Sequence, residues 1–371
     1  MKKKILHIQL LPLLSGVQNV MLHILAALDP EEYDIYVASR PDGPLVEEVI
    51  KHGYTHIPLP LLKHAISPWD IVVLIQLMFL CRKHRFDIVH THSSKPGFLG
   101  RIAAKIAGVP MVIHTGHGAP FHDGQSLLTQ WIYKKLEKTG ALFCDKMVFV
   151  NHSHRLYYIQ HNLIKPAKAI TIYNALNPIL LKQIESYATH KPHNSDIVTI
   201  GSILRFSTQK NIIETIAAAI RVCLARNDVN FIFVGDGEYY NLCNMMVQTH
   251  KLGDRIFLPG WQSNPALWLS KFDVFMLYSL YEGLPLSIIE AMYAALPVIC
   301  SRIPSNAELV DDSNGWLIHL EQPKVLEAEL HNIIDAKDSY RQKGESGKSK
   351  AMELCSYENF IAAYLEIYNG D

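Results

Sequence analysis

The 371-residue chain lacks the features that mark a secreted or membrane-spanning protein. Its six cysteines form no Cys-x-x-Cys pair and no regular framework, which indicates reduced thiols and not a disulfide scaffold. The start, MKKK followed by the strand-like ILHIQLL, shows no signal-peptide cleavage pattern. The longest apolar run, residues 71–81, contains Gln76 and is too short to span a bilayer. We therefore expect a cytoplasmic protein without a transmembrane segment.

A net charge is also lacking, because 35 Lys and Arg balance 35 Asp and Glu, but the two halves differ in sign. Residues 1–190 hold 20 basic and 13 acidic residues (+7), whereas residues 191–371 hold 15 and 22 (−7). A basic first half suits an anionic membrane surface or a pyrophosphate-bearing acceptor, although the halves could simply attract each other across a cleft. A nucleic-acid partner is not expected, since no basic run is interleaved with aromatic residues.

Strand-like apolar runs alternate with helical patterns along the whole chain. In the first half, the expected strands are KILHIQL, YDIYVAS, DIVHTHS, MVIHTGH and KMVFVNH, separated by helices near 17–28, 44–52, 68–81, 97–107 and 125–142. From Asp196 the pattern restarts with DIVTIGS, NFIFVGD, RIFLPGW, VFMLYS, PVICS and GWLIHL, separated by helices near 211–226, 238–250, 264–270 and 286–295. Such alternation predicts parallel sheets covered by helices on both faces.

The chain is longer than one hydrophobic core usually requires, so two Rossmann-like domains of the α/β class are predicted. The first spans residues 1–190 and the second 191–355, with a polar linker at 191–196 that contains Pro192. Residues 356–371 form a final amphipathic helix.

Two carboxylates, Glu282 and Glu290, lie either side of a Gly-Leu-Pro loop that opens a helix, in YEGLPLSIIEAMYAALPVICS (281–301). Helix N-termini carry unpaired N–H groups and partial positive charge, and therefore hold phosphates. Nearby carboxylates can accept hydrogen bonds from sugar hydroxyls, so the segment suits a nucleotide-sugar. The alternative is that both residues only stabilise the start of the helix electrostatically.

A cationic loop adds to this pattern. Arg205 and Lys210 lie between a strand that ends near Gly201 and a helix that starts near Asn211. In doubly wound sheets ligands bind beyond the carboxyl ends of strands, and these two cations suit a diphosphate there. Gly235, in the turn GDGE (235–238), follows the next strand and is a weaker nucleotide-binding signal.

The sequence resembles the retaining family-4 glycosyltransferases, which have the GT-B fold. The Glu-x7-Glu spacing of Glu282 and Glu290 matches the family's signature, and further marks follow the family's order along nearly the whole length: SGVQNV (15–20), HTHSSKPGFLGRIAA (90–104), HTGHG (114–118), GSILRFSTQKN (201–211), FVGDGE (233–238), PGW (259–261) and residues 308–315. The resemblance implies two facing Rossmann-like domains, with the C-terminal helix returning to the first.

The resemblance also implies roles for individual residues. The expected catalytic residues are His117, beside the transferring sugar, and Arg205, Lys210 and Glu282. Glu282 is expected to bind hydroxyls of the donor sugar and Glu290 those of the ribose, and the remaining donor-binding residues are Gly16, Arg205, Lys210, Gly235, Gly283, Leu284 and Leu286. His90, His92 and Ser93 are expected on the acceptor side. The family usually has Gly-Gly where this chain has Ser15-Gly16, and a Gly where it has Ala295.

Neither a metal nor a cofactor is expected. His90 and His92 share one strand face and could join His114, His117 and His122 in a metal site, but no Asp or Cys shows metal-ligand spacing. The Asp-x-Asp pair that binds metal in the other large glycosyltransferase fold is missing. Because Arg205 and Lys210 already supply positive charge, no catalytic metal is expected. The nucleotide-sugar itself is a substrate and not a cofactor.

The expected function is the transfer of a hexose or N-acetylhexosamine with retention of configuration. The donor is expected to be a UDP-sugar, and the acceptor a polyprenyl-diphosphate-linked saccharide. The stretches 6–22 and 90–101 resemble transferases of bacterial O-antigen and capsule synthesis, which act at the inner face of the cytoplasmic membrane. The cluster Arg82–Arg85 could lie on such a surface, or could be the solvated end of a core helix. Alternatives are another GT-B enzyme, such as a nucleotide-sugar epimerase or a sugar phosphorylase, and a non-catalytic nucleotide-sugar-binding subunit.

Overall fold

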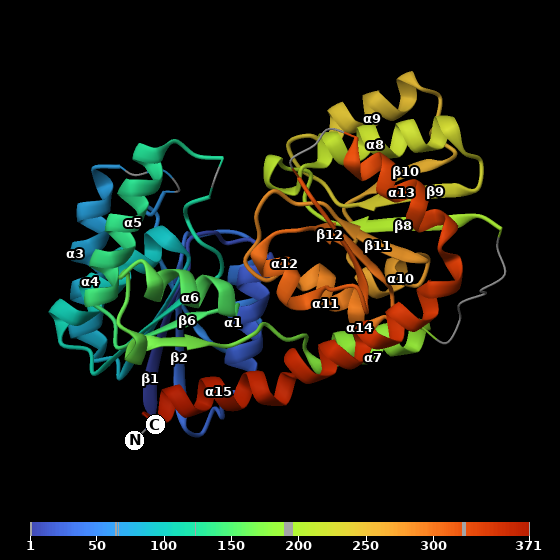
Figure 1. The fold of residues 1–371 in the computed structure, drawn as a ribbon. Helices are drawn as coiled ribbons and strands as arrows, with labels where there is room; N and C mark the ends of the chain where they lie inside the picture. Colours follow the sequence, from blue (N-terminus) through green and yellow to red (C-terminus); the bar gives the residue numbers. More distant parts are fainter. Residues whose placement is uncertain are drawn as a thin grey trace. The chain divides into compact units, whose positions relative to one another are not determined.

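The computed structural model describes residues 2–63, 65, 67–122, 124–188, 196–320 and 324–370, and it divides into two compact units (Figure 1). Unit 1 comprises Met1–Asn174 and Glu358–Asp371, and unit 2 comprises Ala175–Tyr357. The linker expected at 191–196 lies, apart from Asp196, outside the described residues. The division falls at Asn174, so helix α7 (Pro178–Ala188) belongs to unit 2.

Unit 1 is built on a seven-stranded parallel sheet in the order β3-β2-β1-β4-β5-β6-β7. Its strands are β1 (Lys3–Ile8), β2 (Tyr33–Ser39), β3 (Thr55–Pro58), β4 (Ile88–His92), β5 (Met111–Gly116), β6 (Lys146–Phe149) and β7 (Ala169–Thr171). Strand β4 is buried along its whole length and β1 over its last four residues, which explains why they appear in the sequence as runs and not as alternating patterns. The order reverses direction at β1 and β4, where a doubly wound sheet binds ligands.

Helices connect these strands, as right-handed crossovers require. They are α1 (Gly16–Ala26), α2 (Pro44–Lys51), α3 (Trp69–His84), α4 (Ser94–Ala107), α5 (Leu127–Leu142), α6 (His152–Gln160) and the short η1 (Pro166–Lys168). Helix α4 approaches the sheet closely because it carries glycines where it crosses the strands. A Cβ on Gly97 would lie 2.3 Å from Cε1 of His114, and one on Gly100 would lie 2.6 Å from Cγ2 of Thr91.

Unit 2 repeats the architecture with a six-stranded parallel sheet in the order β10-β9-β8-β11-β12-β13. The strands are β8 (Val198–Ile203), β9 (Val229–Val234), β10 (Ile256–Gly260), β11 (Val274–Leu277), β12 (Val298–Ser301) and β13 (Gly315–Ile318). Besides α7, its helices are η2 (Thr208–Lys210), α8 (Ile212–Ala225), α9 (Tyr240–Thr249), α10 (Pro265–Leu269), α11 (Leu286–Tyr293), α12 (Pro304–Leu309), α13 (Val325–Asp335), η3 (Lys337–Ser339) and α14 (Tyr340–Leu354).

The last helix, α15 (Tyr357–Asn369), packs against the sheet of unit 1. Two of its tyrosines, Tyr364 and Tyr368, are buried and reach side chains of β4 and β5, with Tyr364 Oη 3.2 Å from Thr115 Oγ1. Lys3 Nζ of β1 also donates to the backbone carbonyl of Tyr368 over 3.3 Å. The final segment of the chain is therefore fixed to the first strand of the fold.

The predicted fold class is confirmed, and all six predicted strands of unit 2 are present. The prediction missed β3 and β7 at the two edges of the first sheet. Both are short, and β3 ends at Pro58, so neither offers the long apolar run of a central strand. Among the described residues, every helix is too short or too polar to cross a membrane.

Candidate functional site

The loops that follow β8 and β11 meet in unit 2 through an ion pair. Lys210, at the end of η2, places Nζ 2.5 Å from Oε1 of Glu282, and both side chains are largely buried. The two strands are neighbours in the sheet, so their carboxyl ends bring the two loops together. Of the predicted catalytic residues, Lys210 and Glu282 are therefore in direct contact.

Gln209, which is not among the predicted site residues, holds the same two loops together. Its side-chain Nε2 donates to the backbone carbonyl of Tyr281 over 3.0 Å and lies 3.5 Å from Oε2 of Glu282. Its own backbone carbonyl accepts from the N–H of Leu280 at 2.8 Å. Both oxygens of the Glu282 carboxylate thus face donors from η2, which fixes the position of the carboxylate.

Arg205 lies in the same loop but has an exposed side chain. Within the described part of the chain, no carboxylate pairs with its guanidinium. The loop rests on the turn after β9, because Gly235 adopts φ +140° and a Cβ there would lie 1.8 Å from the carbonyl oxygen of Leu204. The structure therefore gives Gly235 a packing role that positions Arg205.

Glu290 lies in the second turn of α11, and the segment Gly283–Leu286 leads into that helix. Burial raises the pKa of the Glu290 carboxyl group to about 7. Among the described residues, its carboxylate has no hydrogen-bond partner, so it can accept hydrogen bonds from the hydroxyl groups of a ligand. Leu284 is buried in the core, whereas Gly283 and Leu286 are partly exposed at the start of the helix.

These groups lie on the loop after β8, on the loop after β11 and on α11 of unit 2. Lys210 and Arg205 supply positive charge, and the first N–H groups of α11 have no acceptor within the helix. A diphosphate satisfies both requirements, and the Glu282 and Glu290 carboxylates can accept hydrogen bonds from hydroxyl groups. The arrangement suits a ligand that combines a diphosphate with sugars.

The remaining predicted residues lie in unit 1. Gly16 is the first residue of α1 and therefore belongs to a different unit from the other predicted donor-binding residues. Ser15 precedes the helix in an extended conformation, and its Oγ contacts Oε1 of Gln18. The Ser15-Gly16 pair thus forms a helix start at the carboxyl end of β1.

His90 and His92 lie beneath the surface and not at it, since both are 0% exposed. This differs from the expectation that the pair lines an acceptor site. Ser93 and His117 are half-buried, and Ser93 adopts φ +63°, a strained conformation for a residue with a side chain. Such strain occurs often at binding sites, so Ser93 stays a candidate acceptor residue.

His7 was missed by the sequence prediction. It lies on β1 opposite His90, and ligand atoms of His7, His90 and His92 lie within 4.8 Å of one another. The sequence had suggested His114, His117 and His122 as companions of the pair, and of these His117 places Nε2 3.0 Å from Nδ1 of His92. His114 faces the opposite side of the sheet, where Nδ1 lies 2.9 Å from Thr91 Oγ1. The signal for His7 was a histidine in an otherwise apolar buried strand.

Gln9 was not predicted as a site residue either. It directly follows β1, is 0% exposed, and lies next to the position of His92 in the neighbouring strand. In the described part of the structure, neither polar atom of its side chain has a hydrogen-bond partner. An amide of this kind requires a water molecule or a ligand group.

Two family models together match almost the whole chain. Residues 14–179 match "Glycosyltransferase Family 4" and residues 184–350 match "Glycosyl transferases group 1". A relative from Escherichia coli, UDP-Gal:alpha-D-GlcNAc-diphosphoundecaprenol alpha-1,3-galactosyltransferase, is 36% identical over 86% of this chain and 84% of that protein. N-acetyl-alpha-D-glucosaminyl L-malate synthase of Bacillus anthracis is 24% identical over 81% of this chain and 79% of that protein.

Solved structures agree on the architecture. HepE of Anabaena, in complex with UDP and glucose, superposes with a TM-score of 0.81 at 16% identity and covers 100% of both chains. At that identity the likeness shows the fold alone. Fold, motif order and sequence identity agree, and the chain belongs to the family-4 glycosyltransferases of the GT-B fold.

Proposed function

We propose that this glycosyltransferase moves a hexose or N-acetylhexosamine from a UDP-linked donor to a polyprenyl-diphosphate-linked saccharide, with retention at the anomeric carbon and without a catalytic metal. The acceptor would be an intermediate of bacterial surface polysaccharide, such as O-antigen or capsule. The E. coli relative supports this class of donor and acceptor, because its name specifies UDP-galactose and a diphosphoundecaprenol-linked sugar.

The observation that carries the proposal is the contact between Lys210 and Glu282 beside the start of α11. The departing UDP gains negative charge as its bond to the sugar breaks. A cation that is already fixed in place stabilises that charge without reorganisation, and more strongly in the transition state than in the ground state. Glu282, held by Lys210 and Gln209, would accept hydrogen bonds from hydroxyl groups of the transferring sugar.

The family resemblance supports retention, for which the proposed mechanism needs no protein nucleophile. The bond between the anomeric carbon and the phosphate oxygen breaks, and a bond from the acceptor oxygen forms on the same face of the sugar. The acceptor's proton passes to an oxygen of the leaving phosphate. Arg205 and Lys210 would stabilise this diphosphate, which is the role that a divalent metal has in the other glycosyltransferase fold.

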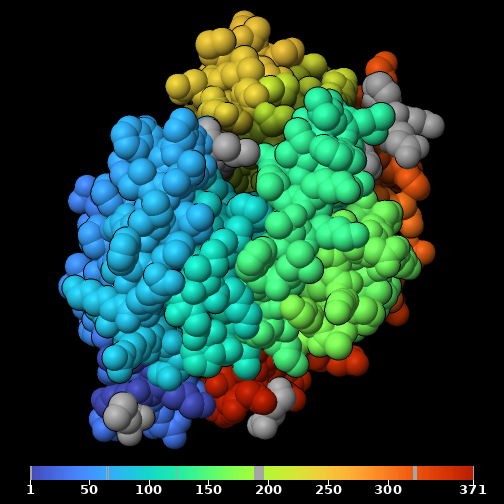
Figure 2. Space-filling model, turned by 90° about the vertical axis from the view of Figure 1, so that its left-hand side faces the viewer, coloured from blue at the N-terminus to red at the C-terminus, as the bar shows by residue number. Residues whose placement is uncertain are grey.

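The face of unit 1 formed by α3 and α5 supports an acceptor held in a membrane. Both helices contact α4, and Figure 2 shows the three segments next to one another in light blue, cyan and green. Large apolar side chains are exposed along α3 and α5, from 41% to 83%: Trp69, Ile71, Val72, Ile75, Phe79, Leu127, Leu128, Trp131 and Ile132. Exposed Arg82, Lys83, Arg85, Lys135 and Lys138 adjoin them. Apolar residues next to cations suit the surface of an anionic bilayer.

The other functions differ in what they require. A sugar phosphorylase or a nucleotide-sugar epimerase of the GT-B fold would act without a saccharide acceptor, and a non-catalytic subunit would bind the nucleotide-sugar without turnover. The ordered Lys210–Glu282 pair and the unpaired carboxylate of Glu290 favour a complete transferase site.

A transfer assay tests the proposal. Purified protein is incubated with a panel of UDP-sugars and a synthetic polyprenyl-diphosphate-N-acetylglucosamine in excess chelator, and products are identified by mass spectrometry and NMR. The proposal predicts an acceptor enlarged by one sugar in the donor's anomeric configuration. Product that forms only after manganese or magnesium is added contradicts metal independence. Isomerisation of the donor sugar without acceptor supports an epimerase, and transfer of sugar to added inorganic phosphate supports a phosphorylase.

A further inference from the structure

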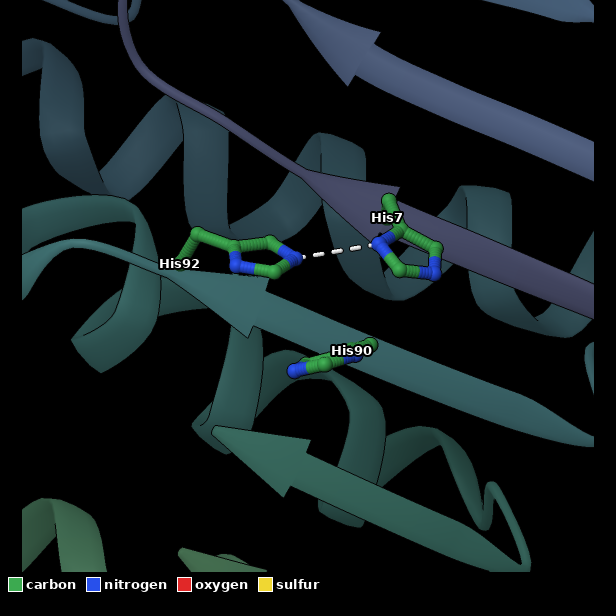
Figure 3. A group of neighbouring side chains, drawn as sticks. All are labelled: His7, His90 and His92. Atoms are coloured by element: carbon green, nitrogen blue, oxygen red, sulfur yellow. Dashed lines mark hydrogen bonds between the residues drawn. The ribbon is translucent and has the colours of Figure 1, made fainter. Parts of the chain in front are cut away.

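Buried histidines form a cluster on one face of the first sheet. His7 and His90 lie opposite each other on β1 and β4, and His92 follows two residues later on the same face (Figure 3). All three are 0% exposed, and their rings pack within 4.3–5.2 Å of one another between centroids. Three polar rings in a buried sheet need a hydrogen-bond partner for every ring nitrogen.

The partners form one continuous chain. His117 Nε2 lies 3.0 Å from His92 Nδ1, and His92 Nε2 lies 3.0 Å from His7 Nδ1. The chain continues into α15, since Tyr368 Oη lies 3.3 Å from His7 Nε2 and 2.6 Å from His90 Nδ1. His90 Nε2 then lies 2.7 Å from Thr115 Oγ1, which lies 3.2 Å from Tyr364 Oη. Seven side chains thus connect the half-buried ring of His117 to the C-terminal helix.

A metal ion is the competing explanation for such a cluster. Three nitrogens within 4.8 Å could converge on one ion, but all six ring nitrogens of His7, His90 and His92 already have partners in the chain. The group contains no carboxylate or thiolate, so a divalent ion would keep its full charge in a buried site. Hydrogen bonding accounts for the observed distances without that cost.

The rings are neutral, because burial lowers the pKa of His7 to about 3 and, together with the charge of neighbouring histidines, lowers the pKa of His90 and His92 well below the usual value. A neutral ring has one N–H and one acceptor nitrogen, so each histidine donates on one side and accepts on the other. The Tyr368 hydroxyl has one hydrogen and lies between two histidines, so it also donates to one of them and accepts from the other. All bonds must therefore run in one of two directions.

The far end of the chain selects the direction. Tyr364 is 1% exposed, and within the described residues its hydroxyl contacts only Thr115. If donation runs from Tyr364 through Thr115, His90, Tyr368, His7 and His92 to His117, each hydroxyl and N–H hydrogen of the six donating side chains has an acceptor in the chain. In the opposite direction one buried hydroxyl hydrogen has no acceptor, which disfavours that direction by roughly 5- to 150-fold.

We propose that this chain holds His117 in the Nδ1–H form, so that its half-buried ring presents an N–H donor, with His92, His7 and Tyr368 as positioning residues. Resting on the proposed function, this N–H would donate to an oxygen of a bound substrate. It follows that α15, distant in sequence, sets the tautomer of a residue in the HTGHG segment.

Nitrogen-15 NMR of the ligand-free wild-type protein at pH 7.5 tests the tautomers without relying on activity. His7, His90, His92 and His117 should all carry the proton on Nδ1, opposite to the Nε2–H form that dominates for free neutral histidine. Signals are assigned with single histidine-to-glutamine variants. An Nε2 proton on His92 or His117, or tight stoichiometric zinc binding that removes these N–H signals, overturns the proposal.

Tyr368→Phe interrupts the chain and keeps the ring shape. His92 and His117 should then show a mixture of both tautomers, whereas His114, which bonds to Thr91 outside the chain, should not change. The variant should also lose about tenfold or more in kcat for transfer, with little change in UDP affinity. An unmixed His117 signal in a folded Tyr368→Phe protein contradicts the link to α15. An absence of transfer in the wild type, with the predicted tautomers present, contradicts the proposed function only.

Discussion

Lys210 and Glu282 are 72 residues apart in the sequence, yet Nζ of the lysine lies 2.5 Å from Oε1 of the glutamate. The contact joins the loop after β8 to the loop before α11. It unites the two strongest sequence motifs of unit 2 in one arrangement of a cation, a carboxylate and a helix N-terminus.

Lys210→Ala should lower kcat for transfer by about 100-fold, because a fixed cation is lost from the place where charge develops on the leaving diphosphate. The affinity for UDP should fall less than turnover does. Steady-state kinetics and calorimetry measure the two effects, with thermal unfolding as a check of folding. Lys182→Ala, an exposed lysine on α7 of the same unit, is the matched control. Turnover of Lys210→Ala within threefold of wild type contradicts the assigned role.

Acid should unfold the protein well above the pH at which isolated carboxylates titrate. His7, His90 and His92 are neutral in the fold, and the pKa of His7 is about 3 against about 6.5 when unfolded. The contribution of these neutral histidines to the free energy of unfolding is complete above pH 6.5. It is lost as pH falls, because the unfolded state then binds more protons than the folded state does. Each histidine should lower the unfolding free energy by about 1.4 kcal/mol per pH unit in that range.

Urea unfolding at pH 7.5, 6.5 and 5.5 measures this dependence. His7→Gln removes one titrating group, so its slope against pH should be smaller than that of wild type by about 1.4 kcal/mol per unit. Equal stability of the wild type at pH 7.5 and 5.5 rejects the neutral histidine cluster.

The wild-type protein should bind vesicles rich in anionic lipid at low salt and dissociate as salt rises, since attraction between exposed charges is screened over about 8–10 Å at physiological ionic strength. Replacing Arg82, Lys83 and Arg85 by Ser should release it, as should Trp131→Ser combined with Leu128→Ser on α5. UDP affinity should not change, because the predicted nucleotide site lies in the other unit. A wild-type protein that stays in the supernatant at low salt rejects the membrane surface.

Ala295→Gly should stabilise unit 2 by about 1 kcal/mol. Ala295 follows α11 with φ +53°, and the N–H of Leu296 bonds back to the carbonyl of Ala291 at 3.0 Å. This left-handed position costs a residue with a Cβ about 1–2 kcal/mol. A glycine removes that cost but loses part of the gain, because its unfolded chain has more conformational entropy. Ala294→Gly, one residue earlier at φ −77°, should destabilise instead. Thermal unfolding of both variants decides, and a lower melting temperature for Ala295→Gly contradicts the argument.

Much of the fold could be predicted from the sequence because buried parallel strands are continuous apolar runs that alternate with helices. The central strands β8, β11 and β12 of unit 2 satisfy this condition, whereas the edge strands β3 and β7 of unit 1 are too short to do so. The positions of Arg205, Glu282 and Glu290 on loops and at a helix start were likewise predictable, since strand ends and helix starts are local signals.

Contacts across the sheets could not be predicted in the same way. The Lys210–Glu282 pair depends on β8 and β11 being neighbours, and the histidine chain depends on His7 lying opposite His90. Tyr364 and Tyr368 take part only because α15 returns to unit 1, and their helix shows an ordinary amphipathic pattern. The ion pair, the histidine chain and the contacts of the two tyrosines all depend on strand order and register, which a single sequence does not contain.

Calorimetry with UDP tests the central claim most directly, because Arg205, the start of α11 and Glu290 are the proposed contacts of the nucleotide. Glu290→Gln should weaken binding at pH 8 by roughly 1–3 kcal/mol, since charged hydrogen bonds to the ribose are lost, and Arg205→Ala should also weaken it. The difference in UDP-binding free energy between wild type and Glu290→Gln should become smaller at pH 6, where a carboxyl group with a pKa of about 7 is mostly protonated. Affinities of both variants equal to that of wild type at pH 8 would show that the nucleotide binds elsewhere.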